Sequence, residues 1–176
     1  LPDLGSTDDS IANGTFRAGI GQPKPLALFA AERVDYSLHR LSHYTATSVQ
    51  HFQRFVLFTN YQRYVEEFRA YARAQVETGN EYVAFVEPGD VLLPNRRRSK
   101  AEPSGKPVPH LPQLPAYHLV RPDRNGITLI DIGVGPSNAK TITDHVAVLR
   151  PHCWMMLGHC AGLRRSQYLG DYVLAH

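Results

Sequence analysis

The sequence predicts an α/β fold in which a mixed sheet is flanked by helices, and two observations carry this prediction. The apolar, largely β-branched run Ile127–Ile132 leads into a glycine turn and then into a helix that we expect to reach about Leu149. A second apolar run, Cys153–Leu157, follows at once and ends in another glycine turn. A strand, a helix and a strand within this length form a βαβ crossover. We therefore expect parallel strands, with both glycine turns at the carboxyl edge of the sheet.

That edge is where open α/β sheets bind ligands. Gly133 and Gly135 allow the backbone to approach a ligand, and Ser137 or Asn138 can cap the helix that follows. The first amides of such a helix favour anions or hydroxyls. The alternative is that the glycines only permit tight packing, and the motif by itself leaves both interpretations open. It is not a dinucleotide fingerprint, because Asn138 stands where the third glycine would be.

The first part of the chain divides into a tail and a helix. Residues 1–25 contain glycine, proline and acidic residues without a helical or strand period, and we interpret them as a linker or tail. A single domain is expected over residues 26–176. Apolar residues at helical spacing predict an amphipathic helix over Leu26–Tyr44. His39 and His43 lie four residues apart on it, but no carboxylate motif accompanies them, so surface histidines are favoured over a zinc pair.

A buried strand at Phe55–Thr59 and a helix that starts at Asn60 are predicted next. The core stripe of this helix consists of Tyr61, Tyr64, Val65, Phe68, Ala72 and Val76. Arg63 interrupts the stripe in the first turn, where a cation opposes the helix dipole at a cost of about 0.3 to 1 kcal/mol. A compensating partner is therefore expected, which could be Glu66 or Glu67 on the helix surface.

The middle of the chain is predicted to contain two strands and a long loop. Tyr82–Val86 has the pattern of a strand, whereas residues 88–115 contain seven prolines and are expected to form an irregular loop. The cluster Arg96–Lys100 in this loop is interpreted as a solvated charged segment, because the loop lacks aromatic residues that could stack on bases. Ala116–Val120 is expected to pair with Ile127–Ile132 as an antiparallel hairpin.

Composition excludes several classes of protein. Of the 176 residues, 43% are hydrophobic and 20% charged, which is ordinary for a globular domain. The formal net charge of +3 is too small and too dispersed to indicate a nucleic-acid groove. Cys153 and Cys160 do not form a disulfide framework, so reduced thiols and a cytoplasmic location are expected. No apolar run approaches the roughly 20 residues that a membrane span needs.

Two stretches resemble a known family. These are HFQRFVLFTNYQRYVEEF and the long stretch GITLIDIGVGPSNAKTITDHVAVLRPHCWMMLGHCAGLRRSQYLGDYVLAH. Together they closely resemble the AMP nucleosidase family, which is bacterial and lies within the purine nucleoside phosphorylase-like superfamily. The resemblance covers most of Ala30–His176 and weakens between Pro88 and Leu111. It implies the amino-terminal part of a phosphorylase/nucleosidase-like catalytic domain. Because the chain opens on Leu1 and ends within a predicted strand at Tyr172–His176, we expect a sheet that is incomplete at the C-terminus.

The resemblance also implies an activity. Family members hydrolyse the N-glycosidic bond of AMP to adenine and ribose 5-phosphate, assemble as hexamers, and use MgATP as an activator and phosphate as a regulator. No covalently bound cofactor is expected. Two alternatives remain: a non-catalytic module that binds nucleotide or assembles with other subunits, and a purine nucleoside phosphorylase.

By the same resemblance, the substrate-binding residues lie on the first strand, the two glycine turns and the residues around them. Arg63 follows the first strand where the superfamily places an arginine that contacts a phosphate. We prefer this interpretation to a surface ion pair. His159 follows Gly158 at a strand end and is expected beside the ribose or the attacking water. The predicted substrate-binding set is Thr59, Asn60, Arg63, Gly133, Gly135, Pro136, Gly158, His159, Cys160 and Ala161.

No catalytic residue is assigned in this chain. Cleavage of an N-glycosidic bond needs a stabilised oxocarbenium-like ribose, a positioned water and a proton for the departing base. The family's catalytic carboxylates lie in segments that would follow His176. Asp131 and Asp144 are the nearest acids to the glycine turns, and Asp131 is expected to point away from the turn or to be tied to backbone amides. The isolated chain is therefore expected to be inactive.

Other interpretations of His159 stay open. It could be a buried structural histidine. A metal site built from His152, Cys153, His159 and Cys160 is disfavoured, because a strand spreads its side chains over both faces. The strand before His159 also lacks the arginine that phosphorylases use for phosphate, so water is the expected nucleophile.

The chain departs from the family pattern at two positions. Ala46 stands where the family has glycine in Thr-Gly-Thr, and Ala161 stands where a second glycine is usual. Alanine can crowd a backbone that approaches a ligand or takes a positive φ.

Overall fold

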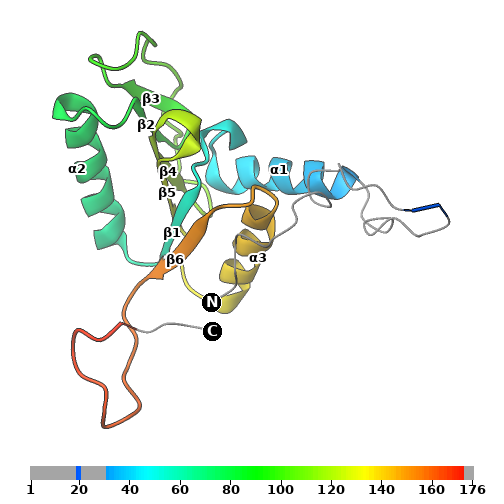
Figure 1. The fold of residues 1–176 in the computed structure, drawn as a ribbon, viewed down its shortest axis with the longest axis vertical. Helices are drawn as coiled ribbons and strands as arrows, with labels where there is room; N and C mark the ends of the chain where they lie inside the picture. The colour runs from blue at the N-terminus through cyan, green and yellow to red at the C-terminus, as the bar shows by residue number, and fades with distance from the viewer. Residues whose placement is uncertain (1–18, 21–30, 173–176) are drawn as a thin grey trace.

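A six-stranded mixed sheet with the order β3-β2-β4-β5-β1-β6 lies at the centre of the protein (Figure 1). The computed structural model describes residues 19–20 and 31–172, with the side chains of residues 31–33 excepted. The strands are β1 (Phe55–Thr59), β2 (Ala84–Glu87), β3 (Val91–Pro94), β4 (Ala116–Val120), β5 (Ile127–Asp131) and β6 (Cys153–Leu157). The α-helices are α1 (Ala31–Thr45), α2 (Gln62–Thr78) and α3 (Pro136–Ala147). Short 3₁₀ helices lie at Val49–His51 and Pro122–Arg124.

The parallel part of the sheet agrees with the prediction. Strand β1 pairs in parallel with both β5 and β6, so Thr59 lies opposite Asp131 on one side and Leu157 on the other. The crossover from β5 through α3 therefore passes over β1 before it reaches β6. Thr59, Gly133 and Gly158 consequently lie at the same edge of the sheet, as predicted. The antiparallel hairpin of β4 and β5 is also confirmed.

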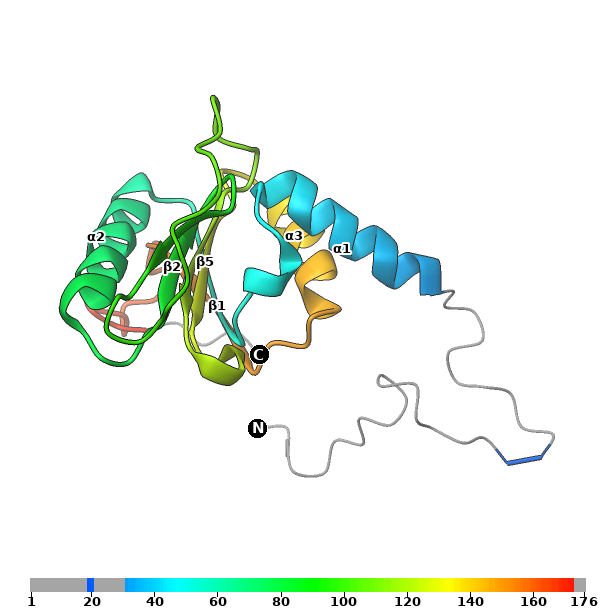
Figure 2. The same cartoon turned by 90° about the horizontal axis from the view of Figure 1, so that it is seen from above.

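Helices cover the two faces of the sheet and bury two separate cores (Figure 2). Helices α1 and α3 contact each other and pack on one face, where Leu41 and Ile142 meet Phe58 and Ile130. Helix α2 packs on the other face, where Val65, Ala72 and Val76 bury apolar residues of β2, β4 and β5. The sheet is thus the middle layer of three, and each of its apolar faces packs against different helices.

The irregular loop predicted over residues 88–115 is wrong in its first part. Strand β3 lies within it and pairs antiparallel with β2. Pro94 is the last residue of this edge strand, a position at which proline costs little because edge strands have amides without a ladder partner. Ser104 then forms a bridge with Leu92, and the amide of Leu92 donates to the Ser104 carbonyl at 3.0 Å. Edge strand β3 is therefore partly covered.

Two glycines allow the chain to cross itself beside β3. Gly89 and Gly105 both have positive φ, +89° and +80°. A Cβ added to Gly89 would lie 2.0 Å from the carbonyl oxygen of Lys106, and one added to Gly105 would lie 2.0 Å from that of Asp90. The amide of Lys106 donates to the Gly89 carbonyl at 3.1 Å. The two backbones touch so closely at this crossing that neither position has room for a side chain.

Several element boundaries differ from prediction. The next strand is Ala84–Glu87 rather than Tyr82–Val86, and α3 ends at Ala147 rather than near Leu149. Gly135 occupies the cap position of α3 in place of Ser137 or Asn138, and no side chain caps the helix. The Asn138 side chain instead donates to the carbonyl of Ile132 at 3.1 Å.

Strand β6 is the other edge of the sheet, and it is exposed. Trp154, Met155 and Met156 have 46%, 53% and 50% of their surface exposed, although the strand is apolar throughout. It pairs only with β1 among the described strands. Composition predicted the strand but not its exposure.

Some expectations fall on residues that the structure does not describe. The linker at residues 1–25 lies outside the described residues except for 19 and 20, and so does the predicted start of the first helix at 26–30. Of the expected strand at Tyr172–His176, only Tyr172 is described, and it is not in a strand. Within the described part of the chain, no helix has the length and apolar character needed to cross a bilayer.

Candidate functional site at the carboxyl edge

The carboxyl ends of β1 and β5 form a switch point in the sheet. The two strands are neighbours, yet β1 continues into α2 on one face and β5 continues into α3 on the other face. Open α/β sheets bind ligands in the crevice outside such a pair of strand ends. The exit of β6 lies on the other side of β1, about 10 Å from the exit of β5 given the usual strand spacing.

The turn after β5 depends on its glycines. Gly133 and Gly135 adopt φ values of +60° and +108°, which disfavour residues with a side chain. A Cβ added at Gly135 would meet nothing within 4 Å, so this glycine is required by conformation and not by lack of space. The Asp131 carboxylate accepts a hydrogen bond from the Gly133 amide at 3.0 Å, as expected. Pro136 begins α3 directly after this turn.

In the turn after β1, the polar groups of Thr59 are hydrogen-bonded to the protein's own backbone. Thr59 is fully buried, and its hydroxyl accepts a hydrogen bond from the Tyr61 amide at 3.2 Å. Its carbonyl accepts from the amide of Ile132 at 2.8 Å, which ties β1 to the start of the glycine turn. Asn60 is exposed beside Gly158, where its Oδ1 would lie 3.8 Å from a Cβ added to that glycine. Thr59 therefore shapes the edge, whereas Asn60 is open to solvent.

His159 contacts two tyrosines: Tyr64 in the first turn of α2 and Tyr61, the residue that precedes this helix. The hydroxyl of Tyr64 lies 2.9 Å from Nε2 of His159. The ring of Tyr61 packs edge-on against the imidazole, with the centroids 5.0 Å apart and the planes at 78°. His159 is exposed, so the alternative of a buried structural histidine is excluded.

The two tyrosines were predicted to belong to the core stripe of α2, and this is wrong. Tyr61 is 37% exposed and Tyr64 is half-buried, while Val65, Ala72 and Val76 form the buried stripe. Both rings pack against His159 after β6 and not against the core of the sheet. Tyr61 and Tyr64 are functional candidates that sequence reasoning missed, because aromatic residues at helical spacing normally indicate a core.

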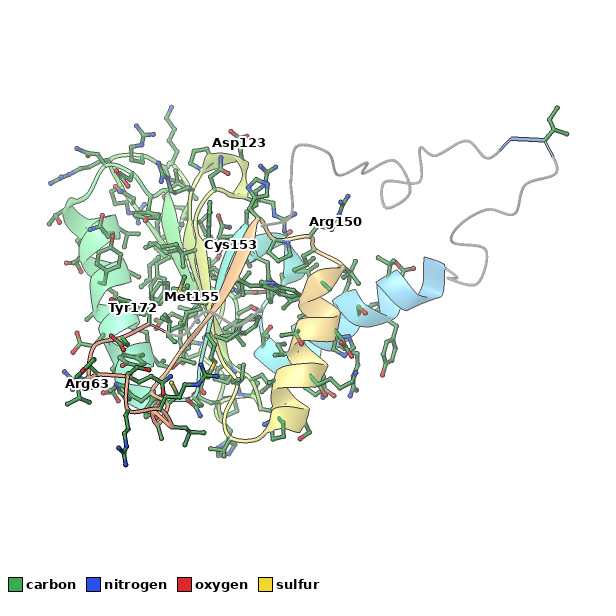
Figure 3. The ribbon with its side chains drawn as sticks, turned by 60° about the horizontal axis from the view of Figure 1, so that its bottom comes forward. Arg63, Asp123, Arg150, Cys153, Met155 and Tyr172 are labelled. Atoms are coloured by element: carbon green, nitrogen blue, oxygen red, sulfur yellow. The ribbon has the colours of Figure 1, made fainter. Side chains whose placement is uncertain are left out.

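Arg63 is an exposed side chain in the first turn of α2. Figure 3 shows it at the end of the molecule toward which β6 runs, opposite the end that carries Asp123. Glu66 accepts a hydrogen bond from Gln62, and within residues 31–172 neither Glu66 nor Glu67 forms a salt bridge with Arg63. The alternative of a surface ion pair with Glu66 or Glu67 is therefore not present among the described residues, and the side chain of Arg63 is exposed to solvent.

The remaining predicted residues follow His159. Cys160 and Ala161 are exposed, and Ala161 does not have a positive φ. Cys153 and Cys160 are free thiols. Among the described residues, no group of three histidine, cysteine or acidic side chains could hold a metal ion, and His39 and His43 are both exposed.

A buried polar network joins strands β4 and β5 to the segment after α1, and it was not predicted from the sequence. His118 of β4 is completely buried; its Nδ1 lies 2.9 Å from the Thr128 hydroxyl and its Nε2 lies 2.9 Å from the Thr47 hydroxyl. The Thr45 hydroxyl continues the chain at 2.9 Å from that of Thr47. Burial lowers the pKa of His118 well below its usual value, with the charge of nearby His51 as a smaller cause, so His118 is neutral. This network is structural and lies away from the glycine turns.

Ala46 lies between the two threonines and has a φ of +51°. Its carbonyl accepts a hydrogen bond from the Gly89 amide at 2.7 Å. Of the two reasons for which glycine could matter here, close approach to a ligand and a positive φ, the structure shows the positive φ, and alanine there carries strain that glycine would not.

A hollow of about 590 Å³ lies far from the glycine turns, between α2 and edge strand β3. Three arginines line it, but each has a partner: Arg73 binds Glu87 at 2.7 Å, Arg96 binds Glu102 at 3.3 Å, and Arg97 donates to the carbonyl of Thr78 at 2.7 Å. The sheet edge is the better candidate site, because the arginines of the hollow are already paired and its remaining lining is mostly apolar.

The fold and the edge define the class of the protein. It is an α/β protein with a mixed sheet covered on both faces and a candidate ligand site at the carboxyl ends of its parallel strands. No family model matches the chain. Over 175 residues, which is 99% of its length, the chain is 49% identical to AMP nucleosidase of Escherichia coli strain K12. It has the same identity and coverage to AMP nucleosidase of Escherichia coli O157:H7.

The resemblance to AMP nucleosidase is thereby confirmed over nearly the whole chain. The chain spans 36% of the length of these curated relatives. At this level of identity the sheet edge and its turns are expected to be shared with them.

Proposed function

We propose that this chain forms part of an AMP nucleosidase, an enzyme that hydrolyses the N-glycosidic bond of AMP to adenine and ribose 5-phosphate in purine salvage. The observation that carries the proposal is the 49% identity over 175 residues to proteins of that name. The open edge at β1, β5 and β6 supports it, because Asn60, the Gly133–Gly135 turn and His159 follow strands that end at the same edge, where open α/β sheets bind ligands. The non-catalytic and phosphorylase alternatives are not favoured by the similarity.

In this proposal the residues of the edge bind and orient the ribose phosphate. The turn at Gly133 and Gly135 leads into Pro136 and the start of α3, where the backbone amides of Ser137 and Asn138 have no side-chain cap and suit an anion or a hydroxyl. The exposed guanidinium of Arg63 supplies positive charge for the phosphate. His159, held beside Tyr61 and Tyr64, contacts the ribose or the attacking water. Thr59, Gly158, Cys160 and Ala161 complete the proposed set as residues that shape or border the edge.

In this proposal neither of the two carboxylates nearest the glycine turns gives a proton to the departing adenine. Asp131 is engaged by the Gly133 amide, and Asp144 pairs with Lys140 on the surface of α3. General acid help is typically worth about 10² to 10⁴ in rate, so without it hydrolysis is slow. We therefore propose that the isolated chain releases adenine from AMP far more slowly than the Escherichia coli relatives do.

The first test compares AMP with adenosine. Replacement of Arg63 by alanine should weaken AMP binding by about 10-fold to 100-fold, because a charge-assisted hydrogen bond is worth about 1.5 to 3 kcal/mol. Adenosine, which lacks the phosphate, should bind nearly as before. Calorimetric titration of the protein with both ligands measures the two changes.

The matched control is Arg98→Ala, which removes the same charge from an exposed residue of the turn at residues 96–98. It should leave both affinities within twofold. Equal losses for AMP and adenosine on Arg63→Ala would remove Arg63 from the phosphate site.

A second assay separates hydrolysis from phosphorolysis. Adenine release should be independent of added phosphate or arsenate if water is the nucleophile. Release that requires phosphate would replace the nucleosidase by a phosphorylase. Release by the 176-residue chain at the rate of the relatives, lost on His159→Ala, would show that His159 transfers the proton.

By resemblance we also propose a cytoplasmic homo-oligomer, a hexamer as in the family, with AMP as its small-molecule ligand and no membrane or nucleic-acid partner. Activation by MgATP belongs to the same proposal. Cell fractionation, sedimentation and titration of activity with MgATP test these three properties separately.

A further inference from the structure

The contact between Tyr64 and His159 joins two elements that are far apart in the sequence. Tyr64 lies in the first turn of α2, and His159 lies two residues after β6. The Tyr64 hydroxyl and Nε2 of His159 are 2.9 Å apart, which is the distance of an ordinary hydrogen bond. This is the single hydrogen bond that the imidazole makes within the described residues. The other ring nitrogen, Nδ1, is left for a different partner.

The chemistry of the two groups gives this hydrogen bond a direction. A phenolic hydroxyl can donate or accept, but with a usual pKa of about 10 it is the stronger proton donor, and an unprotonated imidazole nitrogen is the stronger acceptor. The Tyr64 hydroxyl therefore donates to Nε2. When one nitrogen of a neutral imidazole accepts, the proton lies on the other, so the hydrogen bond selects the tautomer.

The surrounding rings fix the orientation of the imidazole as well. Tyr61 packs edge-on against the imidazole at 5.0 Å, and Tyr61 and Tyr64 pack edge-on against each other at 5.7 Å. Gly158 lies against the same Tyr61 ring, since a Cβ added there would be 3.5 Å from Cε2. The imidazole thus has a ring contact on one side and a hydrogen bond at one end, although it is exposed.

We propose that Tyr64 is a positioning residue that holds His159 as the Nδ1–H tautomer and makes Nδ1–H a hydrogen-bond donor to an oxygen of a ribose phosphate. His159 then acts as a donor that binds substrate and not as the base that activates water, because its basic nitrogen is occupied by Tyr64. The identity of the ligand rests on the proposed function; the positioning of His159 does not.

The tautomer can be read directly by long-range ¹H–¹⁵N NMR of the histidine-labelled chain at a pH of about 9, above the usual imidazole range. A histidine without such a partner favours the Nε2–H form. His159 should show the Nδ1–H pattern in the wild-type chain and should shift to the Nε2–H pattern in Tyr64→Phe. His159→Gln identifies the signal by its disappearance.

The matched control is Tyr61→Phe, which removes a hydroxyl of the neighbouring ring that makes no hydrogen bond to His159 among the described contacts. The tautomer should stay Nδ1–H in this variant. A wild-type His159 in the Nε2–H form, or a tautomer that Tyr64→Phe leaves unchanged, would overturn the proposal.

The ligand half is tested with ribose 5-phosphate. Tyr64→Phe and His159→Gln should each weaken its binding by about threefold to tenfold, the equivalent of one neutral hydrogen bond. No binding by the wild-type chain would overturn the proposed function and this half of the inference, while the tautomer would still decide the positioning. Normal binding by Tyr64→Phe would remove the ligand half alone.

Discussion

Strands β4 and β6 have the same length and opposite surroundings. Strand β4 contains a histidine and is buried along four of its five residues, whereas β6 contains no charged residue and is exposed along four of its five. The difference lies in the sheet order, since β4 is flanked by β2 and β5, while β1 is the one described strand that pairs with β6. Burial here is set by neighbours and not by hydropathy, and a polar residue is buried only where each of its polar atoms finds a partner.

The largest expected effect follows from removing the histidine of β4. His118→Ala should lower the free energy of unfolding by about 3 kcal/mol or more, because it leaves a cavity and takes the partner from two buried hydroxyls. Denaturant unfolding followed by circular dichroism measures the change. His110→Ala, at an exposed histidine, is the control and should stay within about 0.5 kcal/mol. A loss for His118→Ala as small as that of the control would contradict the importance of the network.

The same histidine gives the fold a pH dependence. Burial lowers the pKa of His118 well below about 6.5, and burial also lowers the pKa of His51 despite the opposing charge of Asp90. Unfolding lets both imidazoles bind protons, so stability is full above about pH 6.5 and falls below it, by up to about 1.4 kcal/mol per pH unit for each histidine.

Denaturant titrations between neutral and mildly acidic pH measure that slope. The slope gives the number of protons that the chain takes up on unfolding, and His118→Gln should lower this number by close to one. An unchanged slope in this variant would show that other groups cause the acid sensitivity.

Strain beside the network predicts a gain of about 1 kcal/mol for Ala46→Gly. Alanine at a φ of +51° is disfavoured by about 1 to 2 kcal/mol, which exceeds the extra entropy that glycine brings to the unfolded chain. Thermal unfolding detects this as a higher midpoint. Ala101→Gly, at an exposed position without positive φ, should give no gain. A gain at both positions would mean that strain is not the cause.

The smallest effect on stability is expected in β6. Met155→Lys should change the free energy of unfolding by less than about 1 kcal/mol, because the side chain is already half-exposed. It should nevertheless reduce self-association, since an exposed apolar edge strand pairs with other chains and a lysine there opposes pairing. Sedimentation of the isolated wild-type chain should show association, whereas the variant should be less associated.

Leu111→Lys provides the comparison, as it adds the same charge at an exposed leucine away from β6. Association that falls equally in both variants would point to net charge in place of the strand edge. A monomeric wild-type chain would contradict the prediction for β6 altogether.

Much of the fold could be predicted from local patterns. The runs at Phe55–Thr59, Ile127–Ile132 and Cys153–Leu157 are continuous and apolar, and the structure has a strand at each, with the three strand exits at one edge. Strand β3 was not predicted, because the sequence around it is rich in proline. Pro94 at its end is tolerated because β3 lies at the edge of the sheet. The residues of a strand do not by themselves determine whether it lies at the centre or at the edge of the sheet.

The candidate site was predictable only in part. Glycines that require positive φ mark the turn at Gly133 and Gly135 in the sequence itself. The partnership of Tyr64 with His159 spans 95 positions and appears only when α2 and β6 are placed side by side. His118 escaped for the same reason, because its partners at Thr47 and Thr128 come from two other segments.

The contact of Gly89 with Lys106 and of Gly105 with Asp90 closes the base of a segment that contains strand β3 and, after it, the loop of residues 96–103. Strand β3 is held by β2 and the base is held by backbone contact, so the length of the 96–103 loop does not affect how β2 and β3 pair. The closure cost of a loop rises only by about 0.6 kcal/mol for each doubling of its length. An affinity tag or a fluorophore can therefore be inserted between Lys100 and Ala101 without disturbing the sheet. A side chain at Gly89 or Gly105, in contrast, would push the two crossing backbones apart.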